Sequence, residues 1–73
     1  MLQDDLVRMS TQIAQFFEPY PLDEAVAGVQ DHLVKFWDPS MRTALFAIRR
    51  ANTPALHPLV TKAVDHLLAG SPA

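Results

Sequence analysis

The stretch "KFWDPSMR", residues 35–42, ends one predicted helix and begins the next. Pro39 has a fixed backbone angle that suits the first turn of a helix, and a residue that precedes a proline avoids the helical region. Asp38 is therefore expected to end the preceding helix and to cap the following one. Because the connection is so short, the two helices should meet at a corner, where the Trp37 ring is placed to pack on both.

Apolar residues recur every three or four positions on both sides of this corner, as in amphipathic helices. Prolines separate the repeating segments, because proline interrupts the hydrogen bonds of a helix interior. No segment shows the pattern of a strand. We therefore predict an all-α fold, a small bundle of three to four short helices in one domain, residues 1–73. The expected helices cover residues 4–18, 21–37, 39–51 and 58–69, and residues 70–73 are expected to be a frayed tail.

Signals at the other helix ends agree with these bounds. Pro21 and Pro58 each suit a first helical position, with His57 or a neighbour as a weak cap for the last helix, and Gly70 is a typical helix stop. Gly28 lies inside the second helix at a cost of roughly 1 kcal/mol relative to alanine. It falls on the polar side of that helix, where it either lets a partner backbone approach closely or is simply tolerated.

Two adjacent pairs of aromatic residues end the first two helices, Phe16 with Phe17 and Phe36 with Trp37. Adjacent residues on a helix point about 100° apart, so each pair widens the apolar stripe of its helix to both margins. A chain of 73 residues forms only a small core. The rings therefore either complete the edge of the core or form an apolar patch for a partner.

The third helix carries a second candidate for a partner surface. Phe46 is expected on the side opposite the apolar stripe, with Arg42 and Arg50 one turn before and after it and Arg49 nearby. The arginine stems either cover an exposed ring, or Phe46 anchors an interface, where aromatic and arginine residues are enriched. We favour the interface. The expected buried stripe consists of Met41, Ala44, Leu45 and Ile48.

The overall composition argues against several classes of protein. Eight acidic residues against six lysines and arginines give a formal charge of −2, whereas nucleic-acid binders of this size are usually basic. The chain has no cysteine, which excludes disulfides and fits a reducing cytoplasm. No apolar run approaches the roughly 18 residues of a membrane span, and the acidic N-terminus is unlike a signal peptide. We therefore expect neither a nucleic-acid nor a membrane partner.

Residues with catalytic or metal-binding chemistry are few. The sequence has no glycine-rich phosphate loop and no HExxH-type motif, and its serines lack a strand-turn-helix context. A metal site built on the histidines lacks a convincing third ligand, so we interpret His32 and His66 as structural residues at the boundary of the core. We expect no catalytic, cofactor-binding or metal-binding residue in this chain.

With these residues described, a resemblance can be stated. The runs "DLVRMSTQIAQFF" and "EAVAGVQDHLVKFWDPSMR", with "YP" between them, resemble the delta subunit of NAD-dependent, molybdenum- or tungsten-containing formate dehydrogenase. The similarity covers residues 4–42 and continues more loosely through "HPLVTKAV", residues 57–64. The most specific part is "DHLVKFWDPSMR", residues 31–42.

The resemblance implies a cytoplasmic complex of several subunits that oxidises formate to carbon dioxide and reduces NAD. In that complex the catalytic (alpha) subunit holds a molybdopterin-type cofactor with molybdenum or tungsten and iron–sulfur clusters, and companion subunits carry FMN and further clusters. The delta subunit is a small non-catalytic component associated with assembly or stability. On this interpretation Trp37, Asp38 and Arg42 are structural or docking residues, followed by Phe46 and Arg50.

Two alternatives remain open. The first is a transient assembly chaperone that guards the catalytic chain before the molybdenum cofactor is inserted. The second is a free-standing helical regulator, or a weak DNA-binding module that uses Arg42, Arg49 and Arg50.

Overall fold

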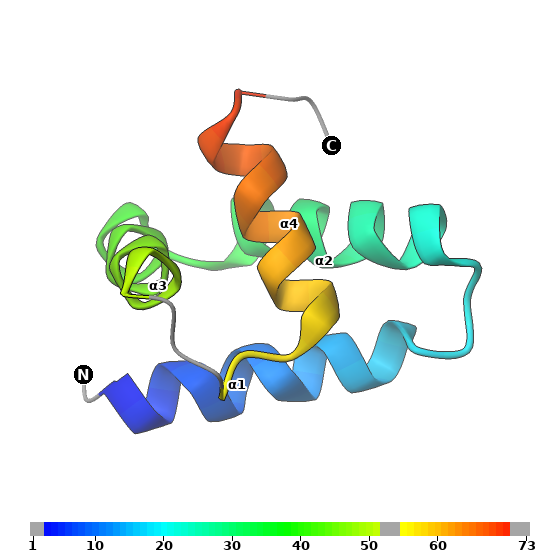
Figure 1. Ribbon diagram of the computed structural model, residues 1–73, viewed down its shortest axis with the longest axis horizontal. Coiled ribbons are helices and arrows are strands. Elements are labelled where there is room, and N and C mark those ends of the chain that lie inside the picture. Colours follow the sequence, from blue (N-terminus) through cyan, green and yellow to red (C-terminus); the bar gives the residue numbers. More distant parts are fainter. Residues whose placement is uncertain (1–2, 52–54, 71–73) are drawn as a thin grey trace.

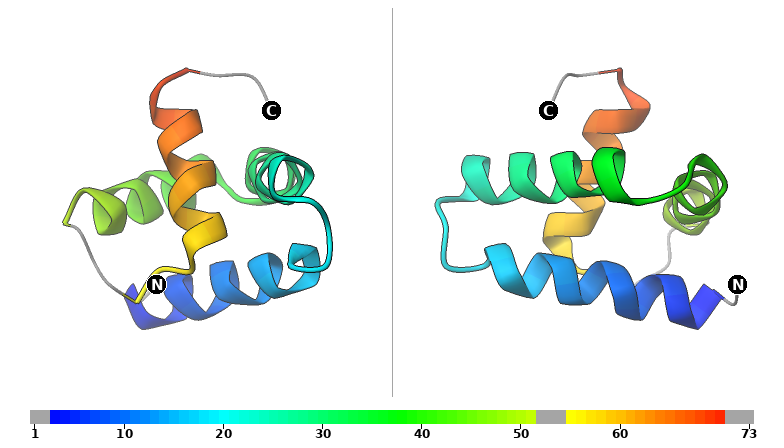
Figure 2. Two further views of the ribbon diagram at one scale, coloured as in Figure 1. Left: turned by 45° about the vertical axis from the view of Figure 1, so that its right-hand side comes forward. Right: turned by 180° about the vertical axis from the view of Figure 1, so that it is seen from behind.

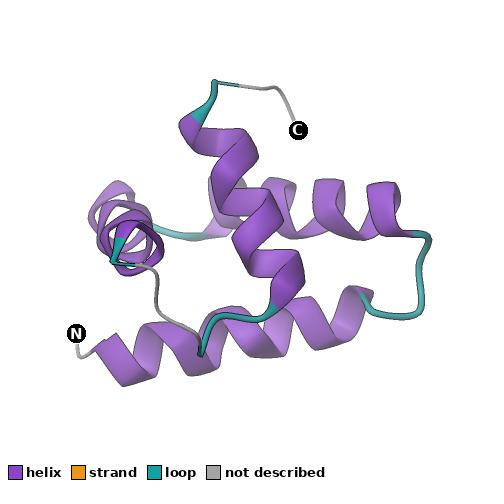
Figure 3. Cartoon of the chain, viewed as in Figure 1, coloured by secondary structure: helices purple, strands orange, loops and turns teal. Residues whose placement is uncertain are grey.

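Four helices make up the part of the chain that the computed structural model describes, residues 3–51 and 55–70. They are α1 (Gln3–Phe17), α2 (Leu22–Phe36), α3 (Pro39–Arg50) and α4 (Pro58–Leu68). No strand occurs in these residues, so the prediction of an all-α fold is confirmed (Figure 3). Each helix begins and ends within one residue of its predicted bounds. Of the predicted tail, residues 71–73 lie outside the described part.

The helices are arranged around an antiparallel pair. α1 and α2 run side by side in opposite directions, and α4 crosses in front of them in Figure 1, where α3 is seen nearly end-on. The view from behind in Figure 2 shows α4 on the far side of the α1–α2 pair. One face of this pair is therefore covered by α4, and no further helix of the described residues lies on the opposite face.

The core is built by all four helices and by the corner between α2 and α3. Its most buried large side chains include Val29 and Leu33 of α2, Leu45 of α3 and Val60 and Val64 of α4. α1 contributes the small residues Ser10 and Ala14 beside Leu6, so its backbone lies close to the core. The Ser10 hydroxyl donates a hydrogen bond to the carbonyl oxygen of Val7, at 2.9 Å, which satisfies this buried polar group.

The corner has the predicted backbone but not the predicted cap. Trp37 and Asp38 are both extended, and Pro39 is the first residue of α3. Asp38 occupies the N-cap position, and its carbonyl oxygen accepts from the Arg42 amide at 3.0 Å, but its carboxylate makes no capping hydrogen bond. The expected side-chain cap is therefore wrong, and the proline and the backbone define the start of α3.

Other helix ends were predicted with mixed success. Pro21 precedes α2 as its N-cap and is not its first residue, so that assignment is wrong by one position. The His57 cap is confirmed, because its ring Nδ1 accepts from the Leu59 amide at 3.0 Å. Gly70 follows α4 with a φ of 78°, a left-handed conformation that ends helices and favours glycine.

Three large apolar residues of α1 and α2 lie at the surface. Phe16, Leu22 and Phe36 are 68%, 60% and 73% exposed, so the Phe16 and Phe36 rings do not complete the edge of the core, one of the two alternatives from the sequence. In α1 the line Leu6–Ser10–Ala14 faces the core instead, and this rotates Phe16 outward. The small residues explain the rotation, because they allow closer packing than a line of larger side chains.

Candidate protein-binding site

The two aromatic pairs are each divided between the interior and the surface. Trp37 is 6% exposed and belongs to the core, and Phe17 is partly buried against it. Their neighbours Phe36 and Phe16 are the two most exposed large apolar residues of the described chain. One ring of each pair therefore completes the core, as one alternative from the sequence expected. The other ring lies at the surface, and the alternative of a patch for a partner stays a prediction for Phe16 and Phe36.

An apolar groove lies between α1 and α2 and carries both exposed rings. It consists of two adjoining hollows of about 380 and 360 Å³. Both hollows are lined by Ile13, Phe16 and His32. Phe17 and Phe36 line the first hollow as well, and Met9, Gln12 and Trp37 line the second. No residue of α3 or α4 lines either hollow, so the groove lies along the α1–α2 pair alone.

His32 lines both hollows of this groove, and its ring packs beside the Phe36 ring. Its ring centroid is 4.8 Å from that of Phe36, with the ring planes tilted by 39°. On the opposite side, the Phe16 ring meets the Phe17 ring edge-on, with centroids 5.0 Å apart. These contacts fit the interpretation of His32 as a boundary residue. Within the described ranges, no group of three or more His, Asp or Glu side chains could hold a metal ion.

Gly28 leaves room for the Phe17 ring, which lines the groove. A Cβ atom added there would lie under 3.0 Å from three atoms of the Phe17 ring, closer than side chains approach one another. Because Gly28 has no side chain, the Phe17 ring can occupy this space. Both explanations drawn from the sequence, that Gly28 admits a partner backbone or is simply tolerated, are therefore wrong. Sequence reasoning missed this contact because it joins α1 to α2.

Arg42 closes the end of α2. Its Nη1 donates to the carbonyl oxygens of Trp37, Val34 and Leu33, at 2.6, 3.1 and 3.3 Å. The last carbonyls of a helix lack partners within the helix and carry partial negative charge, which a guanidinium satisfies. Together with the burial of Trp37, these bonds give both residues a structural role at the corner.

The remaining predicted partner residues are spread along α3. Phe46 is half-buried and packs against the core, so its expected exposed position is wrong. Arg50 is exposed at the last residue of α3. The structure thus brings Trp37, Asp38 and Arg42 together at the corner, whereas Phe46 and Arg50 follow along α3.

Arg49 joins α3 to α4 through an ion pair. Its Nε and Nη2 donate to the two carboxylate oxygens of Asp65, at 2.8 and 3.1 Å. The hydrogen bond from Arg49 lowers the pKa of Asp65 below its ordinary value, and the same contact raises the pKa of Arg49. Arg42 and Arg49, two of the three arginines of the DNA-binding alternative, are therefore engaged inside the chain.

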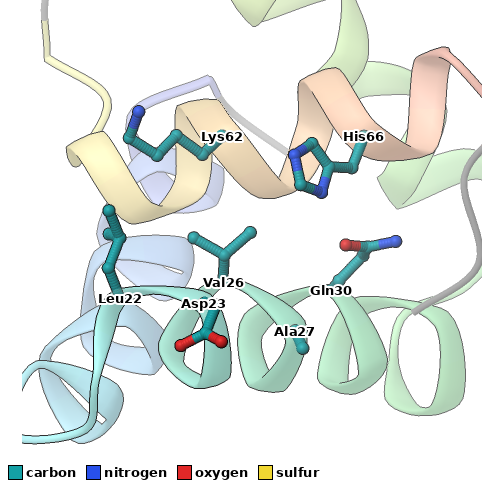
Figure 4. Close-up of a pocket in the computed structure, with 7 residues that line it drawn as sticks. All are labelled: Leu22, Asp23, Val26, Ala27, Gln30, Lys62 and His66. Atoms are coloured by element: carbon teal, nitrogen blue, oxygen red, sulfur yellow. The ribbon is translucent and has the colours of Figure 1, made fainter.

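A separate hollow, of about 390 Å³, lies between α2 and α4 (Figure 4). Lys62 and His66 contribute from successive turns of α4, and Asp23 and Gln30 from α2. Leu22, Val26 and Ala27 complete its lining. This hollow carries both signs of charge and is lined by no Phe, Tyr or Trp side chain, so the α1–α2 groove is the stronger candidate for a protein-binding site.

The fold and the groove together define a small all-α protein with an exposed aromatic surface of the kind that binds other proteins. Comparison with protein families then gives the particular family. The family of the NADH-dependent formate dehydrogenase delta subunit, FdsD, matches residues 5–64 of the 73 in the chain. The chain therefore belongs to this family, and the resemblance found in the sequence is confirmed. No curated protein and no solved structure gave a significant match.

Proposed function

We propose that this chain is a non-catalytic accessory subunit of a cytoplasmic NAD-dependent formate dehydrogenase, and that it docks on the catalytic (alpha) subunit through the α1–α2 groove. Membership of the delta-subunit family supports a place in that complex. The observation that carries the docking surface is the exposure of Phe16 and Phe36, at 68% and 73%, on one groove. Exposed aromatic rings beside a hollow are typical anchors of protein interfaces.

The subunit acts by stabilising its partner. A chain that binds the folded, cofactor-loaded enzyme and not its unfolded form shifts the equilibrium towards the folded form by mass action. In this proposal the other subunits carry all the cofactors. These are the pterin cofactor with molybdenum or tungsten, the iron–sulfur clusters and FMN, together with the NAD site. Formate oxidation takes place there, and the chain described here contributes stability or assembly.

In this proposal Trp37 and Arg42 support the groove from within the chain, and Asp38, which is exposed, stays a predicted partner residue. Trp37 belongs to the core and lines the second hollow of the groove. Arg42 donates hydrogen bonds to the carbonyl oxygens at the end of α2, where Phe36 is the last residue. Phe46 and Arg50 remain predicted partner residues of lower rank, because Phe46 packs mainly on its own core.

Affinity purification of the tagged chain from its native cells, grown with formate, tests the proposal. The eluate is examined by mass spectrometry and by formate-dependent reduction of NAD. Stoichiometric recovery with the catalytic subunit and with activity is the expected result. Recovery only with an inactive, cofactor-free catalytic chain would instead establish the assembly chaperone. Recovery of no formate dehydrogenase subunit would contradict both roles.

A further inference from the structure

His57 joins the start of α4 to the end of α1 through both nitrogens of its ring. Its Nδ1 accepts a hydrogen bond from the Leu59 amide at 3.0 Å, which caps the first turn of α4. Its Nε2 lies 2.6 Å from a carboxylate oxygen of Glu18, the residue that directly follows α1. These two contacts, from Glu18 to His57 and from His57 to Leu59, are called the His57 bridge below.

The two contacts of the bridge determine where the ring proton lies. A backbone N–H group only donates, so the Nδ1 atom that accepts from Leu59 carries no proton. A neutral imidazole has one N–H, which is therefore at Nε2. This N–H donates to the Glu18 carboxylate, which accepts when it is ionised. The His57 bridge is therefore complete when the ring is neutral and in its Nε2–H form.

A second proton on the ring would break one contact of the bridge and keep the other. Both nitrogens of a protonated imidazole are donors, so Nδ1–H would face the Leu59 N–H and the cap would be lost. The positive charge would also lie at the start of α4, where the helix dipole disfavours cations. The Glu18 contact would remain as an ion pair, but its side chain is 52% exposed, and exposed pairs contribute little. Protonation is therefore expected to loosen the start of α4.

Other charged residues nearby do not compensate for the lost cap. Within the described ranges, Glu18 provides the one ion pair that His57 makes. Lys62, the next charged residue along α4, and Asp23 of α2 both line the hollow between these helices, and neither pairs with His57. Arg49 of α3 is already paired with an acid of α4. The response of His57 to acid is therefore expected to depend on its own bridge.

We propose that the His57 bridge is an acid-sensitive contact, which is closed while His57 is neutral and opens on its α4 side when the ring is protonated. Histidine suits such a contact, because its charge ordinarily changes between about pH 5 and pH 8. α4 covers one face of the α1–α2 pair (Figure 1), and its first turn carries Leu59 and Val60, which are 7% and 0% exposed. Opening of the bridge therefore loosens a part of the core. This property belongs to the chain itself and does not depend on the docking of a partner.

Nuclear magnetic resonance on the full chain tests the proposal. At about pH 8, above the usual range of histidine protonation, the ¹⁵N chemical shifts of the His57 ring should show a proton on Nε2 alone. As the pH is lowered, the Leu59 amide signal should shift with the same midpoint as the His57 ring. Its protection factor against hydrogen exchange, which corrects for the intrinsic effect of pH, should fall about fivefold, as expected for loss of a helix cap.

Two histidine variants show whether the response of Leu59 comes from His57. Asparagine caps helices and does not titrate, so in His57→Asn the Leu59 amide should stay protected as the pH falls through the histidine range. His66→Asn removes an exposed histidine of the same helix and should leave the response of Leu59 as it is in the unmodified chain.

Three results would each overturn the proposal. The first is a proton on Nδ1 of the neutral His57 ring. The second is a Leu59 amide whose signal and protection do not follow the protonation of His57. The third is the same response of Leu59 in His57→Asn as in the unmodified chain.

Discussion

The Arg42 guanidinium on α3 donates to the carbonyl oxygen of Trp37, at 2.6 Å, and so fastens the start of one helix to the end of another. The same nitrogen also reaches Val34 and Leu33. Since it has two hydrogens for three acceptors, one of these bonds is shared. This contact stabilises the corner between α2 and α3. At this corner the Trp37 side chain packs in the core and the Phe36 side chain lines the groove.

Replacing Arg42 is expected to destabilise the chain. Arg42→Ala leaves the last carbonyls of α2 without this donor, and the expected loss is about 1–2 kcal/mol of the free energy of unfolding, measured by urea denaturation. Arg42→Lys should lose less, because an ammonium still reaches some of the carbonyls. Arg50→Ala, at an exposed position on the same helix, is the control and should stay within about 0.5 kcal/mol. Equal losses for Arg42→Ala and Arg50→Ala would contradict the capping role.

The neighbours Phe36 and Trp37 should respond to truncation in opposite ways. Trp37→Ala removes a ring that is 6% exposed, and the expected cost of about 3–5 kcal/mol is comparable with the whole stability of so small a domain. Phe36→Ala removes a ring that is 73% exposed and should cost less than about 1 kcal/mol. Circular dichroism during thermal unfolding measures both. A severe loss for Phe36→Ala would place its ring in the core.

Gly28 and Phe17 should be coupled energetically. Alanine is favoured over glycine by about 1 kcal/mol in a helix interior. Gly28→Ala should nevertheless fail to stabilise the chain, because its Cβ would collide with the Phe17 ring. In a Phe17→Ala background the same change should become stabilising. A double-mutant cycle measures this difference, and additive effects would show that the two residues do not interact.

Acid should weaken the link between α3 and α4. The pKa of Asp65 is lower in the folded chain than its ordinary value of 3.8, because Arg49 donates to its carboxylate. The pair therefore contributes stability above that ordinary value, and the contribution is lost as the pH falls through the lower folded-state pKa. Both side chains are partly exposed, so the contribution is modest. In an NMR titration, Arg49→Gln should raise the pKa of Asp65, and an unchanged pKa would contradict the pairing.

The helices could be predicted closely from the sequence because their signals are local. Three helix ends follow from the residue type alone, because proline and glycine act through their own backbone conformations. These are the starts of α3 and α4 at Pro39 and Pro58 and the end of α4 before Gly70. The cap by His57 is also local, reaching only two residues along the chain.

The candidate site could be predicted only in part, because it depends on contacts between helices. The sequence identified both aromatic pairs, but the rotation of α1 about its axis decides whether Phe16 or Phe17 faces outward. That rotation follows from the packing of Ser10 and Ala14 against the core, which periodicity does not reveal. Phe46 was misplaced for the same reason, since it packs against a core to which all four helices contribute.

The most direct test is the amount of catalytic subunit recovered per tagged chain when both exposed rings are removed. The double variant Phe16→Ala, Phe36→Ala should lower the recovery about tenfold or more, as loss of interface anchors does, while its helicity stays unchanged. Val34→Ala, an exposed apolar residue on the same helix outside the groove, serves as the control and should leave recovery intact. Undiminished recovery with the double variant would contradict docking through the groove.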